Sequence, residues 1–240
     1  MMSRPIYGLT IRALLGQKRT LALVLLSCAP VFMAAVFSVA ADADADPLNF
    51  YSRLVQRLFI PLITALVALI VGVSAIGDER EDGTILYLVA TPLPRLGIVV
   101  AKILAAWTVC VALLVPSVVV CGLLALTGDV TFALLFWPAL GVTLAALAYC
   151  AVGGWLSLQV RRPIVVGVIY ILLWEGSIAT YAASADRLSI AAYGRALVAE
   201  QLPQSAAGVV SPETAAVILI VATVAGALLG ARALTRTELP

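Results

Sequence analysis

The sequence predicts an all-α fold, that of a polytopic membrane protein with six transmembrane helices. Of the 240 residues, 63% are hydrophobic and 12% are charged, whereas soluble domains carry about 25% charged residues. Several apolar runs are as long as the ~20 residues that a helix needs to cross a bilayer, and the charged residues gather between these runs. We therefore expect residues 1–240 to form a single transmembrane domain.

The segment that precedes the first apolar run, residues 1–20, predicts an interfacial helix. On a helix, Tyr7, Ile11, Leu14 and Leu15 line one face, and basic residues line another. An amphipathic helix of this kind lies on the membrane surface. The alternative is a frayed N-terminus whose basic residues only set the topology.

Six apolar runs follow, and each is long enough to span a bilayer. Their predicted limits are residues 21–41, 58–77, 101–126, 132–158, 163–182 and 214–234. Pro116 and Pro138 fall inside the third and fourth runs, where neighbouring helices can satisfy the carbonyl groups that a proline leaves free. Residues 183–213 predict an external loop that contains a helix. The apolar face of that helix consists of Leu188, Ile190, Ala191, Tyr193 and Leu197.

The basic residues predict the orientation of these spans. If both termini are cytoplasmic, 11 of the 15 lysine and arginine residues lie on the cytoplasmic side and four on the other. Loops that stay in the cytoplasm carry an excess of Lys and Arg. The sequence therefore predicts a multi-pass protein with both termini in the cytoplasm.

The segment between the second and third spans, residues 78–96, is the most informative part of the chain. It opens with five consecutive charges, Asp78 to Asp82, which cannot lie in hydrocarbon. Ile85, Leu86, Leu88 and Val89 then give a short helix one apolar face. A compact amphipathic helix beside the membrane is typical of a docking element for a soluble partner.

This segment resembles the coupling helix of type-2 ABC transporter membrane subunits, and the six-span layout agrees with that family along essentially the whole chain. The predicted contacts with an ATPase are Asp78, Glu79, Arg80, Glu81, Asp82, Gly83, Thr84, Leu86, Pro92 and Arg95, and Lys102 belongs to the same pattern. The segment from Tyr170 to Glu175 resembles the Trp-Glu-bearing fifth span of small bacterial members.

The resemblance implies a permease subunit of an ATP-driven exporter in a bacterial cell (inner) membrane. It implies that two membrane subunits pair, as a homodimer or with a paralogous permease, and that each binds an ABC ATP-binding subunit. ATP and Mg²⁺ would bind to that partner, because this chain has no GxxxxGK[ST] phosphate loop. We expect no cofactor and no enzymatic activity in this chain. A branch of the same fold that assists copper-enzyme maturation is an alternative.

Glu175 is the acidic residue that lies well inside a predicted span. A charged side chain at mid-bilayer costs about 2.5–3.5 kcal/mol on insertion scales, so Glu175 needs a partner or a cavity. With Trp174 beside it, one interpretation is a transport pathway or a subunit interface. The other is a hydrogen-bonded packing residue, with Thr180 or a nearby serine as its partner.

Two other classes of protein compete with the transporter subunit. An ATP-independent carrier would show inverted repeats and broken spans, and an intramembrane lipid-modifying enzyme would need clustered polar groups. The chain has no histidine, which excludes histidine-ligated metal sites and Ser–His or Cys–His catalytic pairs. The four cysteines all lie in apolar runs and read as small buried hydrophobes. A net charge of +2 with no basic block gives no indication of nucleic-acid binding.

Overall fold

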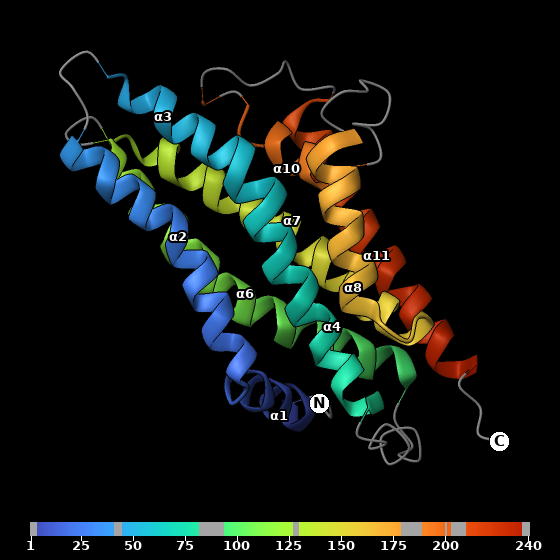
Figure 1. Ribbon diagram of the computed structural model, residues 1–240. Coiled ribbons are helices and arrows are strands. Elements are labelled where there is room, and N and C mark those ends of the chain that lie inside the picture. Colours follow the sequence, from blue (N-terminus) through green and yellow to red (C-terminus); the bar gives the residue numbers. More distant parts are fainter. Residues whose placement is uncertain are drawn as a thin grey trace.

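The structure is a bundle of antiparallel helices (Figure 1). The computed structural model describes residues 4–40, 45–81, 94–126, 130–178, 189–199, 201–202 and 210–236. Every element within these ranges is a helix. The helices are α1 (Arg4–Leu15), α2 (Lys18–Ala40), α3 (Pro47–Arg53), η1 (Leu54–Thr64), α4 (Ala65–Glu81), α6 (Arg95–Ala125), α7 (Phe132–Gln159), α8 (Pro163–Tyr170), η2 (Ile171–Ile178), α10 (Ile190–Ala196) and α11 (Pro212–Arg236).

The helices run between two ends of the bundle. α1, the end of α4 and the end of α11 lie at one end, which we call the termini end, and α3 and α10 lie at the other, the α10 end (Figure 1). Five helices of the described ranges are long and apolar enough to cross a membrane: Lys18–Ala40, Pro47–Arg80, Arg95–Ala125, Phe132–Gln159 and Pro212–Thr235. The all-α polytopic class is therefore confirmed.

The predicted fifth span, residues 163–182, is shorter in the described residues. α8 and the π-helix η2 follow each other, each eight residues long. Together they run from the termini end towards the α10 end (Figure 1). Because the described helix ends at Ile178, it does not reach the length of the other five, and the count of six spans stays a prediction.

The second span is longer than predicted at both ends. Asp46 caps α3 by accepting hydrogen bonds from the N–H groups of Leu48 and Asn49, and helical geometry then continues through η1 and α4 to Glu81. Two buried polar residues before position 58 are accommodated in the helix because they pair with each other. The amide nitrogen of Gln56 donates to the Ser52 hydroxyl at 3.0 Å, and both side chains are buried.

The centre of the bundle is the contact between α4 and α7. A Cβ atom at Gly72 on α4 would lie 2.6 Å from the carbonyl oxygen of Cys150, and one at Gly153 on α7 would lie 2.8 Å from that of Leu69. The two backbones therefore touch where glycine leaves room, as small residues allow between membrane helices. Cys110, Cys121 and Cys150 are buried, as predicted, while Cys28 on α2 is exposed.

The peripheral helices α2 and α11 carry apolar side chains on their exposed faces. Val39 on α2 is 89% exposed, and Val221 on α11 is 59% exposed. Helices that are apolar on every side suit contact with lipid. These two faces are therefore available for lipid or for another membrane subunit.

The N-terminal helix α1 packs against α6. The Tyr7 hydroxyl lies 2.7 Å from the Thr108 hydroxyl, and Leu14 is buried. Leu15, which the sequence placed on the same face as Leu14, is 57% exposed, because consecutive residues of a helix point about 100° apart. The predicted helix is present, and Leu15 lies outside its buried face.

Candidate functional site

The end of α4 carries three consecutive charged residues, and each contacts a different part of the bundle. These are Asp78, Glu79 and Arg80, the first three charges of the island in the sequence. Because successive helical residues point about 100° apart, three neighbouring side chains can reach three sides of the helix end. We call these residues and their partners the α4-end cluster, and it lies at the termini end of the bundle.

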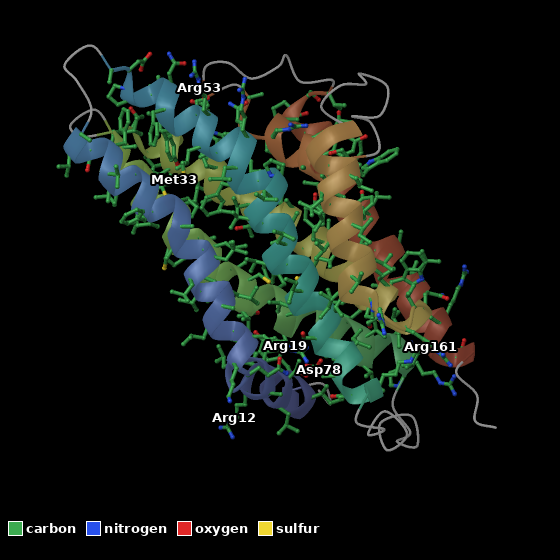
Figure 2. The ribbon with its side chains drawn as sticks, in the orientation of Figure 1. Arg12, Arg19, Met33, Arg53, Asp78 and Arg161 are labelled. Carbon is green, nitrogen blue, oxygen red and sulfur yellow. The ribbon has the colours of Figure 1, made fainter. Side chains whose placement is uncertain are left out.

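Asp78 contacts the junction of α1 and α2. Its carboxylate accepts hydrogen bonds from the Gln17 side-chain amide and, at 3.2 Å, from the Arg19 guanidinium. Figure 2 shows Arg19 and Asp78 beside each other at this end of the molecule. The side chain of Arg19 is 52% exposed, so water screens this ion pair and its contribution to stability is small.

Glu79 contacts Lys102 of α6 in an ion pair that is largely removed from water. The Lys102 side chain is 3% exposed and that of Glu79 is 33% exposed. The Lys102 ammonium also donates a hydrogen bond to the carbonyl oxygen of Ala75 at 3.0 Å. A buried ammonium is tolerated only when it is paired and hydrogen-bonded, and Lys102 satisfies both conditions through α4. This pair ties the two helices on either side of residues 82–93.

Arg80 contacts the end of α7. Its guanidinium donates to the carbonyl oxygens of Ser157, at 2.8 Å, and Val160, at 3.5 Å. The last carbonyl groups of a helix have no partner within the helix and carry partial negative charge. The arginine therefore caps α7 and fixes the end of α4 to it.

The predicted ATPase contacts divide into three groups. Asp78, Glu79 and Arg80 bind other parts of their own chain. Glu81 is the last residue of α4 and Arg95 is the first of α6, where it is half-exposed. The others, Asp82, Gly83, Thr84, Leu86 and Pro92, lie outside the described residues, as does the short helix expected at residues 85–89.

A second cluster surrounds Glu175 on η2, nearer to the α10 end of the bundle. Glu175 and Lys102 are the two charged residues that are buried among the described residues, and each is 2% exposed when backbone and side chain are taken together. One Glu175 oxygen accepts hydrogen bonds from the Tyr149 hydroxyl (2.9 Å), the Tyr170 hydroxyl (3.4 Å) and the Ile190 N–H (3.1 Å), and the other accepts one from the Ser189 hydroxyl. These donors nearly fill the roughly four acceptor positions of a carboxylate.

The arrangement explains how a carboxylate is accommodated among apolar helices. Of the partners suggested by the sequence, the nearby serine is Ser189, and Thr180 lies outside the described residues. Sequence reasoning missed Tyr149 and Tyr170. The sequence signal that could have identified them is that both tyrosines lie within apolar runs, where a buried hydroxyl needs a hydrogen-bond partner. Trp174 is half-buried, and its indole N–H has no hydrogen-bond partner in the described part of the chain.

A family model described as "ABC-2 family transporter protein" matches residues 17–183. The matched region runs from the start of α2 to beyond η2 and includes both Glu79 and Glu175. No curated protein matches the chain.

Proposed function

This chain belongs to the ABC-2 family of transporter proteins, and from that premise we propose that it is the membrane-spanning permease subunit of an ATP-driven export system. A separate ABC ATP-binding subunit would hydrolyse ATP with Mg²⁺, and this chain would convert the resulting movement into passage of substrate. A second copy or a paralogous permease would complete the membrane part. The observation that carries the proposal is the α4-end cluster, which ties four parts of the bundle together and directly precedes residues 82–93 in the sequence.

The α4-end cluster supports a route for mechanical coupling. Residues 82–93 connect α4 to α6, and the Glu79–Lys102 pair holds these two helices together. A force applied to residues 82–93 would therefore act on both helices at once. Through Asp78 it would reach the α1–α2 junction, and through Arg80 it would reach α7. A rigid base of this kind is what a docking segment needs in order to move the bundle as a unit.

We assign the charged residues at the end of α4 and after it to two different roles. The charges of Asp78, Glu79 and Arg80 are engaged inside the chain, so we assign them to transmission. We assign docking of the ATP-binding subunit to Glu81, Asp82, the segment up to Pro92, and Arg95. These residues flank or form the connection between α4 and α6.

The charge distribution supports a cytoplasmic location for the termini end. Figure 2 shows Arg12, Arg19 and Arg161 at this end and Arg53 at the opposite one. An excess of basic residues marks the cytoplasmic side. We therefore place both termini and residues 82–93 in the cytoplasm of a bacterial cell, where an ATP-binding subunit would meet them.

The test is purification of the tagged chain in mild detergent from cells that express its neighbouring genes, followed by an ATPase assay. We expect a roughly stoichiometric partner that carries a phosphate loop. Glu81→Lys with Asp82→Lys should abolish its recovery, while Arg12→Gln, a charge change on an exposed residue of α1, should not. A chain that carries no ATPase, or a partner retained in full by the double variant, would overturn the proposal or the docking assignment respectively.

Glu79→Lys is unsuitable as a docking test. It would place a second ammonium beside the buried Lys102, and like charges 4 Å apart repel by about 4 kcal/mol at an effective dielectric constant of 20. Loss of the partner in that variant would then report a disturbed base of α4. Glu81 and Asp82 avoid this problem because they follow the cluster.

A further inference from the structure

The helix α10 packs against other helices of the bundle. A Cβ atom at Gly194 would lie 2.9 Å from Ile60 of η1 and 3.3 Å from Ala145 of α7. From the other side, a Cβ atom at Gly141 of α7 would lie 2.9 Å from the Gly194 carbonyl oxygen. The helix therefore occupies a seat between η1 and α7 that was made by small residues.

The residues that α10 itself buries are small, and the larger buried side chains of this segment, Leu197 and Val198, follow the helix. Its sequence, IAAYGRA, is only seven residues long, and Ala191, Gly194 and Ala196 are its buried residues. Stabilisation from burial scales with apolar area, and an isolated helix of this length is unstable in water. Polar contacts at its first turn therefore add to the burial of Leu197 and Val198 in fixing α10 in position.

Those polar contacts converge on Glu175. Its carboxylate accepts hydrogen bonds from the Ser189 hydroxyl and from the Ile190 N–H, at the first turn of α10. Ser189 in turn caps the helix by accepting a hydrogen bond from the Ala192 N–H at 3.0 Å. The Tyr149 and Tyr170 hydroxyls fix the same carboxylate from α7 and α8. One side chain thus joins the start of α10 to two other helices.

We propose that Glu175 is a positioning residue that fastens α10 in its seat between η1 and α7, and that α10 leaves this seat during the transport cycle. The second half of this statement rests on the proposed function. A carboxylate suits such a contact because its hydrogen bonds can be exchanged for bonds to water when the α10 end opens. An apolar side chain of the same size would hold the helix by burial and would gain nothing from the open state.

The test measures how often the seat opens. In a chain whose four native cysteines are replaced by alanine, Val198→Cys places a thiol directly after α10 at a fully buried position. A membrane-impermeant maleimide then reacts only when α10 has moved. We expect slow labelling in the parent, and a rate at least about tenfold higher with Glu175→Leu, because one hydrogen bond to a charged group contributes that much.

Three further variants separate fastening from general loosening. Glu175→Gln keeps a carbonyl oxygen for the Ile190 N–H and should label at an intermediate rate. Tyr170→Phe removes the longest of the four bonds, at 3.4 Å, and should stay near the parent rate. Leu114→Ala removes a fully buried side chain of α6, a helix that contributes none of the four hydrogen bonds to Glu175, and should lower thermal stability without faster labelling. Equal labelling of Glu175→Leu and Leu114→Ala, or no change with Glu175→Leu, would overturn the fastening role.

The movement of α10 is tested in the complex with the ATP-binding partner. Labelling of Val198→Cys should differ severalfold between the nucleotide-free state and an ATP-trapped state, and Glu175→Leu should reduce this difference. Equal rates in the two states would show that α10 is a fixed cover and would overturn its proposed movement. The experiment on the isolated chain needs no ATPase. Its labelling rates therefore still test the role of Glu175 if the proposed function is wrong.

Discussion

We expect the two residues of the Glu79–Lys102 ion pair to differ in how much stability is lost when each is replaced. In Glu79→Ala the ammonium of Lys102, whose side chain is 3% exposed, loses its ion pair with Glu79 and keeps the Ala75 carbonyl. In Lys102→Met the carboxylate of Glu79, whose side chain is 33% exposed, can turn to water. Removal of one partner of a buried pair costs about 3–5 kcal/mol. We therefore expect a loss of about 3 kcal/mol for Glu79→Ala and about 1 kcal/mol for Lys102→Met.

The double variant measures the interaction itself. Once Lys102 is methionine there is no buried charge to leave unpaired, so adding Glu79→Ala should cost little more, and the coupling free energy should be about 3 kcal/mol. Thermal unfolding in detergent, followed by the helical circular-dichroism signal, is the assay. By the scaling for proteins of 150–250 residues, a loss of 3 kcal/mol lowers Tm by about 6–12 °C.

The exposed ion pair between Asp78 and Arg19 provides the control. Asp78→Ala removes the pair with Arg19, whose side chain is 52% exposed, and should cost less than about 1 kcal/mol. If Glu79→Ala and Lys102→Met lowered stability equally, the reasoning from unequal burial would be wrong. If their effects were additive, the pair would not hold α4 to α6. The coupling route through the α4-end cluster would then lose its main contact.

Three other predictions concern the helix contacts and the exposed surface. Gly72→Ala should destabilise the chain by about 1–3 kcal/mol, because the new methyl group would lie 2.6–2.7 Å from the Cys150 backbone. Gly8→Ala, whose methyl group would have no neighbour within 4 Å, should have no such effect in the same unfolding assay. Arg80→Gln should cost about 1–2 kcal/mol by removing the cap of α7; an unchanged Tm would argue against that cap. Met33→Lys, on the exposed face of α2 (Figure 2), should reduce membrane insertion by about 2.5–3.5 kcal/mol in a glycosylation-based insertion assay, and normal insertion would mean that this face lies away from lipid.

Much of the architecture could be predicted because a bilayer limits what a chain can do. Backbone polar groups in hydrocarbon must be satisfied within the chain, so long apolar runs predict helices and the charged residues between them predict the ends. The extent of those helices was less predictable. The helix of the second span begins at Pro47 and continues through Asp78, Glu79 and Arg80 to Glu81. Hydrogen bonds within the helix satisfy polar residues near its first end, and contacts with other helices satisfy those near its last.

The sequence identified residues of the candidate sites that need a polar partner, but it did not indicate which partners they have. The sequence identified Glu175 as a carboxylate that needs a partner, and it included Lys102 in the pattern that follows the charged island. It did not indicate that Glu175 would meet Tyr149, which precedes it by 26 positions, and Ser189, which follows it by 14. Nor did it indicate that the first three island charges bind their own chain.

The sequence by itself determined the class of the protein, the approximate positions of its helices and the few polar residues that need a polar partner in apolar surroundings. The tertiary structure decided the partner of each, including Glu79 with Lys102, Arg80 with the end of α7, and Glu175 with the start of α10. The physical reason is that a helix that is apolar on every side carries no periodic signal of the face that turns inward. Only packing, with Gly72 against α7 and Gly194 between η1 and α7, fixes that rotation and so brings the polar groups together.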